Sequence, residues 1–315
     1  MRPQVALRAV LAVILAGALA LAGCGGDDAS DRSAAELIEA TFSSDQPVES
    51  GRLQLGLRAD LAESGTVEGT LTARFARGGE GQIPKLDGQL SLVTGGGSLE
   101  AGAISTGDKG YLVVAGRAYE VPAGDWERIT KGYVASEREV DERRRSQPTL
   151  ASLGIDPRRW VVDPRKAGEG EVEGVRTIRI TAGVDVPRMV ADVAKVAEGN
   201  DLSERLGADD VEQLERSVRS ARVEIDTGRE DERLRRLVVR LELASGTLEL
   251  SVQYADLDEP QEIAAPEGAR PLSELTEALE RASGTGSGGG SDPYTECLEK
   301  AGADLRKVQR CAKHL

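Results

Sequence analysis

Histidine and aromatic residues are scarce in this sequence of 315 residues. The only histidine is His314, and aromatic residues make up 3% of the chain. Without a histidine in the body of the chain, Ser-His-Asp and Cys-His catalysis and histidine-rich zinc sites are excluded from a folded domain. With so few aromatic side chains, the core of such a domain must be aliphatic.

Basic residues are also in the minority, because 40 Lys and Arg stand against 54 Asp and Glu, a net charge of −14. Such a chain lacks the basic patch that neutralises phosphates, which excludes nucleic acid as a partner, and anionic lipid surfaces repel it. Carboxylates are abundant, yet no pair of them has a spacing that differs from a charged surface. We therefore expect no enzyme, no cofactor, and neither a catalytic nor a metal site.

Cysteine occurs only three times, and the first, Cys24, follows a run of 13 uncharged residues, Ala9 to Leu21. This run is too short for a bilayer of about 30 Å, which needs roughly 20 apolar residues, so it predicts a signal peptide over residues 1–23. The sequence Leu-Ala-Gly-Cys resembles the bacterial lipobox, whose cysteine is acylated after cleavage. We expect Cys24 to carry acyl chains such as palmitate and to hold the protein on the extracytoplasmic side of the cell membrane.

A flexible acidic tether over residues 24–32 is expected before the folded domain, residues 33–282. Ser33 and Glu36 have the spacing of a capping box, which predicts a helix with an apolar face of Leu37, Ile38 and Phe42.

Alternating apolar and polar residues predict about nine strands with one apolar face each. Glycine-rich breaks separate the first strands by hairpin-length distances, so neighbouring strands should pair antiparallel in a meander. The expected strands are residues 53–57, 67–75, 89–92, 110–114, 117–121, 172–182, 223–225, 237–243 and 248–254.

Helices interrupt this pattern. A charged helix is expected over residues 125–145, and Pro187 is expected at the first position of another that carries Met189 and Val190. A further helix is predicted near residues 209–217.

A Gly- and Ser-rich linker, residues 283–292, precedes a segment that contains Cys297 and Cys311. In one continuous helix these cysteines would be about 21 Å apart, so a break at Gly302 and a disulfide-linked helical hairpin over residues 293–315 are predicted. Zinc is disfavoured, because only His314 could add a ligand to the two thiols. The hairpin is either a docking module for a partner or a stabilised tail.

Several segments resemble the LppX and LprAFG lipoproteins of actinobacteria, members of the LolA-like group. They include Leu153 to Pro157, Trp160 with Asp163 and Pro164, Val172 to Thr177, and Tyr254 to Leu257. The resemblance spans roughly residues 24–282. It implies an α+β fold in which a curled antiparallel sheet forms a half barrel, helices cover its concave face, and a cavity between them holds acyl chains.

Two functions follow. The first is a membrane-anchored protein that binds, and carries, lipids or glycolipids; the second is an envelope interaction or sensor protein whose hairpin contacts a protein partner. A sheet packed tightly under its helices would give the same alternation without a cavity, but small residues at Gly69, Ala101, Ala103 and Gly174 leave room for one. The expected lipid-pocket residues are Leu53, Leu55, Leu57, Val67, Leu71, Phe75, Leu90, Leu92, Ile178, Ile180, Val239, Leu241, Leu250 and Val252.

Overall fold

The computed structural model describes residues 31–43, 48–62, 65–79, 82–144, 157–198 and 216–283. Cys24, Cys297 and Cys311 lie outside these ranges, as do the expected signal peptide, the hairpin and nearly all of the helix near residues 209–217. Side chains are not described for residues 136–144, 193–198 and 279–283. Within the described part of the chain, no helix combines the length and apolar character needed to span a bilayer.

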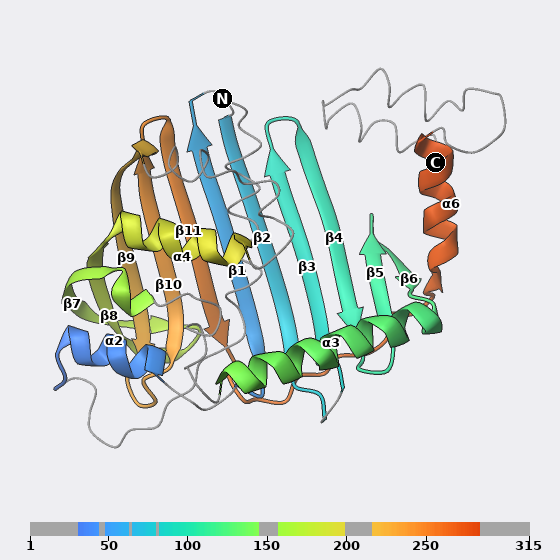
Figure 1. The fold of residues 1–315 in the computed structure, drawn as a ribbon, viewed down its shortest axis with the longest axis horizontal. Helices are drawn as coiled ribbons and strands as arrows, with labels where there is room; N and C mark the ends of the chain where they lie inside the picture. The colour runs from blue at the N-terminus through green and yellow to red at the C-terminus, as the bar shows by residue number, and fades with distance from the viewer. Residues whose placement is uncertain are drawn as a thin grey trace. The chain divides into compact units, whose positions relative to one another are not determined.

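The chain divides into two compact units, which we call the first unit, residues 1–65 and 136–260, and the second unit, residues 66–135 and 261–315. Each unit combines helices with an antiparallel sheet (Figure 1). The predicted α+β class and the antiparallel pairing of consecutive strands are therefore confirmed.

In the first unit, six described strands follow the order β1, β11, β10, β9, β8, β7, and every neighbouring pair is antiparallel. The strands nearest β7 bend toward helix α2 (Figure 1), as expected for a curled sheet. The elements are β1 (Ser50–Leu61), β7 (Val161–Val172), β8 (Val175–Val184), β9 (Val218–Gly228), β10 (Leu234–Leu243), β11 (Gly246–Ala255), α2 (Ala34–Ser43), α4 (Val186–Glu198) and the 3₁₀ helix η2 (Pro157–Arg159).

In the second unit, β2 to β6 form an antiparallel meander, and the two-residue strand β12 pairs with β6 in parallel. Helix α3 follows β6 directly, which confirms the charged helix predicted near residues 125–145. The elements are β2 (Gly65–Ala76), β3 (Lys85–Thr94), β4 (Gly97–Ser105), β5 (Gly110–Val114), β6 (Arg117–Glu120), β12 (Arg270–Pro271), α6 (Leu272–Ser283) and α3 (Ala123–Arg144), of which residues 123–135 belong to this unit.

The predicted capping box forms at the start of α2. The Ser33 backbone N–H donates to Glu36 Oε2 at 2.7 Å, and the Glu36 N–H donates to Ser33 Oγ at 3.3 Å. Hydrogen bonds from the Ser33 side chain and backbone N–H to the Glu36 carboxylate hold the pKa of this carboxyl below its ordinary value. Arg32, at the end of the expected tether, pairs with Glu232 at 3.0 Å, so contacts with the first unit's sheet region begin before Ser33.

Helix α4 begins one residue earlier than predicted. The Asp185 carboxylate accepts a hydrogen bond from the Arg188 N–H at 3.2 Å, which makes Asp185 the N-cap and Pro187 the second helical residue. Met189 and Val190 are buried, as expected for the apolar face of this helix.

Strands β4, β7 and β12 and helix α6 were not predicted from the sequence. The strand expected over residues 172–182 is wrong at its start, because a turn at Glu173 and Gly174 separates β7 from β8. Both residues have a positive φ, 49° and 79°, which suits a tight turn. Gly174, expected to leave room on a strand face, lies in this turn instead.

Tyr254 gives the first unit a testable dependence on alkaline pH. Burial raises the pKa of its hydroxyl above the ordinary value of about 10. The neutral hydroxyl is therefore favoured in the folded state, and its contribution is complete below pH 10 and is lost as the pH rises above 10. We expect the free energy of unfolding to fall less steeply between pH 10 and 11 in Tyr254→Phe than in the natural protein. Urea titrations at several pH values measure the difference, and parallel curves would contradict it.

Candidate functional site

One face of the first unit's sheet, which we call the inner face, is continuously aliphatic. The register aligns Ile180, Ile225, Leu237, Val252 and Leu55 in one row across five strands. The adjacent row is equally apolar and contains Ala182, Val223, Val239, Leu250 and Leu57. Because side chains alternate between the faces of a strand, both rows lie on the same side of the sheet.

Helix α2 covers part of the inner face. Its Thr41 hydroxyl lies 2.8 Å from the hydroxyl of Thr227 on β9, and both residues are fully buried. Leu37, Ile38 and Phe42 of α2 are buried as predicted. This part of the sheet is therefore a packed core with no space for a ligand.

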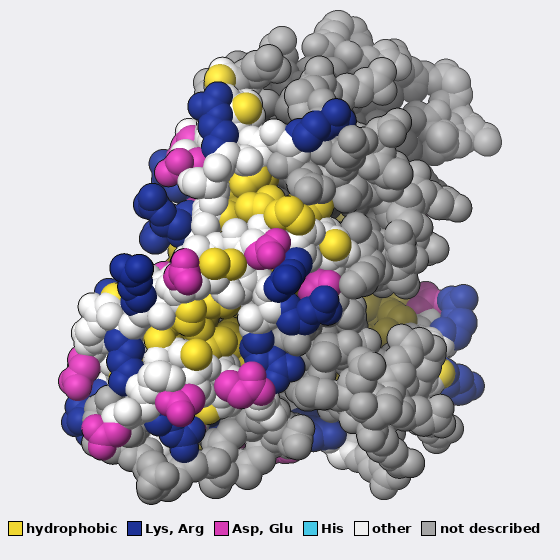
Figure 2. All heavy atoms as spheres, turned by 60° about the vertical axis from the view of Figure 1, so that its left-hand side comes forward, with side chains coloured by type: hydrophobic (Ala, Val, Ile, Leu, Met, Phe, Trp, Pro, Cys, Tyr) yellow, Lys and Arg dark blue, Asp and Glu magenta, His cyan; other side chains and the backbone are white. Residues whose placement is uncertain are grey.

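Helix α4 lies on the same side of the sheet and packs on β9 (Figure 1). The indole N–H of Trp160 donates to the buried Asp192 carboxylate at 2.8 Å, which fixes the middle of α4 against the segment before β7. At this end of the first unit, apolar side chains alternate on the surface with Lys, Arg, Asp and Glu (Figure 2).

The middle of the inner face is less completely covered than its flanks. Ile180, Ile225 and Leu55 retain only 0%, 1% and 2% of their accessible surface, on strands β8, β9 and β1. Between them, β10 and β11 carry four half-buried side chains, Leu237, Val239, Leu250 and Val252, which we call the aliphatic patch. Leu237 pairs with Val252 and Val239 with Leu250, so the patch is contiguous. It offers accessible apolar surface enclosed on both sides by buried core.

The opposite face of this sheet carries the charges. Asp226, fully buried, accepts hydrogen bonds from Arg179 Nε at 2.9 Å and from Arg236 Nε at 2.8 Å. Glu224 pairs with Arg236 beside them, and Arg240 with Glu249 at 2.6 Å. The hydrogen bond to Asp226 raises the pKa of the Arg179 guanidinium, so this network keeps its charges.

The second unit has an apolar face of its own. Leu71, Leu90, Ala101 and Val114 form one row across β2 to β5. Leu99 and Leu112 on this face are 49% and 38% exposed. Three of the small residues singled out in the sequence, Gly69, Ala101 and Ala103, lie on this face. Their short side chains leave space above the strands.

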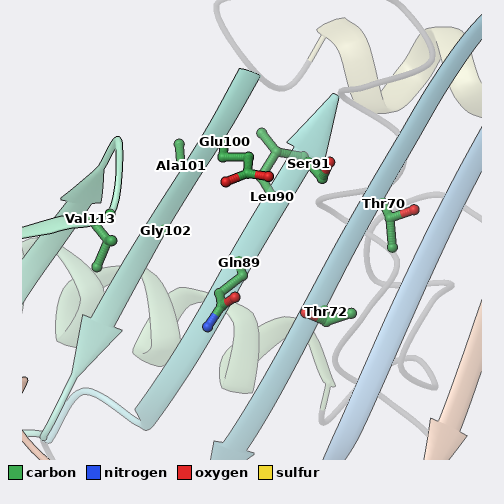
Figure 3. Close-up of a pocket in the computed structure, with 10 residues that line it drawn as sticks. Thr70, Thr72, Gln89, Leu90, Ser91, Glu100, Ala101, Gly102 and Val113 are labelled. Carbon is green, nitrogen blue, oxygen red and sulfur yellow. The ribbon is translucent and has the colours of Figure 1, made fainter. Parts of the chain in front are cut away.

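The other face of the second unit is polar and holds a shallow hollow of about 440 Å³ (Figure 3). Thr70, Thr72, Gln89, Ser91 and Glu100 line it from strands β2, β3 and β4, and Val113 of β5 adds an apolar wall. Its lining therefore mixes polar and apolar groups and lacks the continuous aliphatic rows of the inner face.

No protein-family model and no curated protein matches the sequence. The fold is similar to that of LprF from Mycobacterium bovis. The two chains share 14% identity with a TM-score of 0.40, over 77% of this chain and 100% of LprF. The lipoprotein LppX of Mycobacterium tuberculosis gives 9% identity and a TM-score of 0.34, over 73% and 98%. A LolA superfamily protein from Nitrosomonas europaea gives 8% and 0.21, over 73% and 95%. The resemblance drawn from the sequence names the same groups of proteins.

The expected lipid-pocket residues are found in both units, and some of them are buried while others are half-buried. All of those in the first unit lie on the inner face, and those in the second unit lie on its apolar face. Eight are buried: Leu53, Leu55, Leu57, Val67, Phe75, Ile178, Ile180 and Leu241. Six are half-buried: Leu71, Leu90, Leu92, Val239, Leu250 and Val252. The half-buried set can contact a ligand without unpacking the core.

The accessible side chains of Leu237, Leu99 and Leu112 lie on these faces and were missing from the expected set. Leu237 alternates with Val239 and Leu241, so the same period of two that selected its neighbours could have found it. Leu99 lies between glycine and small residues, and without a recognised strand there was no face on which to place it.

Within the described ranges, no group of three or more His, Cys, Asp or Glu side chains is placed to hold a metal ion. Asp256 and Asp258, which the sequence places two residues apart, act in the turn after β11. Asp256 pairs with Arg52, and Asp258 accepts the Glu49 N–H at 2.8 Å and pairs with Arg233. Burial opposes ionisation of Asp258, but these hydrogen bonds outweigh it and lower its pKa.

Proposed function

We propose that this chain is a membrane-anchored lipoprotein that binds lipid or glycolipid chains on the inner face and carries them at the cell envelope. The aliphatic patch on β10 and β11 is the observation that supports the proposal. Each methylene that an acyl chain buries there contributes about 0.8 kcal/mol, so a chain lying along the patch would gain several kcal/mol. In this proposal, the protein binds and carries the lipid without changing it chemically.

The anchor and the hairpin belong to this proposal as sequence predictions. Acylation of Cys24 would hold the acidic protein on a membrane that its charge alone does not attract. A Cys297–Cys311 disulfide would stabilise residues 293–315 by about 3 kcal/mol in the chain-entropy model. That segment would then be a rigid module for contact with an envelope protein partner.

The test removes the anchor and then asks whether lipid stays bound. We expect the full chain with Cys24→Ser to co-purify with lipid in native mass spectrometry and to bind a fluorescent long-chain acyl probe. The double variant Leu250→Ser with Val252→Thr should weaken probe binding about ten-fold, because two aliphatic contacts become polar.

Ser251 provides the matched control. It lies between the two changed residues in sequence but points to the opposite face of β11, so Ser251→Ala should bind the probe as tightly as the natural protein. Circular dichroism and urea unfolding show whether each variant keeps its fold. An anchor-free protein that neither retains lipid nor takes up the probe would disprove the proposed function.

A further inference from the structure

An open hollow of about 490 Å³ lies in the second unit, beside the first turns of α3. The segment after β4 and the end of β6 form its other walls. Every lining residue belongs to the second unit: Gln82, Gly107, Asp108, Lys109, Glu120, Val121, Ala123, Trp126, Glu127, Thr130 and Lys131. Its volume falls within the range of small-molecule sites, about 300–1,000 Å³. The aliphatic patch proposed for lipid is in the first unit, so the two sites share no residue.

Trp126 forms a wall of this hollow whose orientation is fixed. Its indole N–H donates to the Gly107 carbonyl at 3.3 Å, and the hydroxyl of Thr130 donates to its carbonyl at 2.9 Å. The ring packs directly on Gly110, where a Cβ atom would come within 2.1 Å of it. Only glycine allows this approach, so β5 holds the half-buried ring in a single position. A ligand that contacts the ring pays no cost for ordering it.

Hydrogen-bond donors and acceptors of both charges surround this aromatic wall. Lys109 Nζ lies 2.8 Å from Glu120 Oε1, and Lys131 Nζ lies 2.7 Å from Glu127 Oε1. The pairing raises the pKa of Lys109 and lowers that of Glu127, so these two groups stay charged at neutral pH. Both pairs are exposed, and exposed pairs contribute only about 0–1 kcal/mol, so they can reorient around a ligand at little cost.

The charge balance determines which ligand chemistry fits. Two cations face two carboxylates, and Asp108 adds one further negative charge, so an anion meets a net repulsion. A cation would compete with two lysines for the carboxylates. A neutral hydroxyl group both donates and accepts hydrogen bonds, so it can bind a lysine and a carboxylate together without separating them.

We propose that this hollow, which we call the Trp126 site, binds a neutral carbohydrate of one or two rings. A sugar ring has a flat face of C–H groups that can lie against the fixed indole. Its hydroxyl groups, arranged around the edge, meet the lysine, carboxylate, amide and hydroxyl groups of the rim. An aromatic wall surrounded by paired charges is complementary to such a ligand and to few others.

The chain contains only two tryptophans, which makes the test specific. In the full chain with Trp160→Phe, Trp126 is the only tryptophan that emits. We expect a saturable change in its fluorescence on titration with glucose, mannose or the disaccharide maltose. The reciprocal variant Trp126→Phe keeps Trp160, in the first unit, and should give no response to any of the three sugars. Glu127→Ala combined with Glu120→Ala should weaken binding at least ten-fold.

Saturation-transfer NMR on the unchanged protein repeats the measurement without any substitution, so a folding defect in Trp160→Phe cannot hide the result. Octyl glucoside tests whether a sugar attached to a lipid enters the same site, and we expect an affinity within about three-fold of glucose.

Binding of octyl glucoside alone would assign the contact to its alkyl chain and overturn the proposal. An absence of signal with every sugar, or a response to phosphate or choline in place of sugar, would also overturn the proposal. Lipid binding is measured separately, through substitutions in the aliphatic patch of the full chain, so either proposal can fail without the other.

Discussion

Replacing Asp226 by alanine is expected to lower the free energy of unfolding by about 3 kcal/mol, at the lower end of the cost of breaking a buried ion pair. Asp226 has no accessible surface, and its two carboxylate oxygens each accept a hydrogen bond, one from Arg179 and one from Arg236. Without the carboxylate, both guanidinium groups lose a charge-assisted hydrogen bond within 3 Å. The two arginines are partly exposed and can recover some hydration, which places the expected loss near 3 kcal/mol and not above it.

Glu249 is the matched control for this effect. It lies on the same face of the sheet and also pairs with an arginine, Arg240, but its side chain is 41% exposed. We expect Glu249→Ala to cost less than about 1 kcal/mol, as exposed pairs do. Urea unfolding of both variants gives the comparison. Equal losses would mean that Asp226 adds no more to stability than a surface carboxylate does.

Ile225→Ala is expected to cost about 2–5 kcal/mol, the range for removing a large aliphatic side chain from a packed core. Ile225 is 1% exposed and lies in one row with Ile180, which is completely buried. Few neighbours can move into the space that the substitution leaves, because β8 and β10 pair with β9 on both sides of it. Chemical denaturation measures the loss.

Val239→Ala, a change on the neighbouring strand and the same face, should cost about 1 kcal/mol or less, since the valine is only half-buried. The ratio of the two losses tests whether the aliphatic patch differs from the core beside it. If Val239→Ala destabilised the protein as much as Ile225→Ala, the patch would be ordinary packed core, and the proposed lipid site would lose its support.

Local patterns predicted much of this fold. Ser33 and Glu36 predicted the start of α2 because both hydrogen bonds of a capping box lie within four residues. Alternation of apolar and polar residues placed Leu53, Leu55 and Leu57 on one face, as the pairing of β1 with β11 confirms. In these elements, the information that determines the structure is contained in a short stretch of chain.

Strand β7 could not be recognised in the same way. Its sequence, VVDPRKAGEGEV, is mostly charged or small, and most of its side chains are exposed, so it has no apolar period. It is a strand because β8 supplies its hydrogen-bond partners, which a reading of local sequence cannot show. Strand β4 was not recognised for a similar reason, because its glycine and other small residues give no apolar period.

The aliphatic patch also depends on information that is distant in sequence. The alternation in β9 and in β10 is similar, and it predicted one apolar face for both strands. Ile225 is buried and Val239 is half-buried, although the two strands share the same period, and helices α2 and α4 both contact β9. The packing of the whole unit decides which part of an apolar sheet face a helix covers. The periodicity of one strand carries no information about this packing.

Strand β7 has a further consequence for a protein that acylation would concentrate on a two-dimensional surface. It is the last strand of the first unit's described order, and a free edge of this kind can template pairing with a second molecule. Pro164 lacks the N–H that such pairing needs, and the register shifts between Val162 and Arg165 and again between Lys166 and Gly168. On a crowded membrane, the missing N–H and the two irregularities would therefore disfavour sheet-like pairing between copies at this edge.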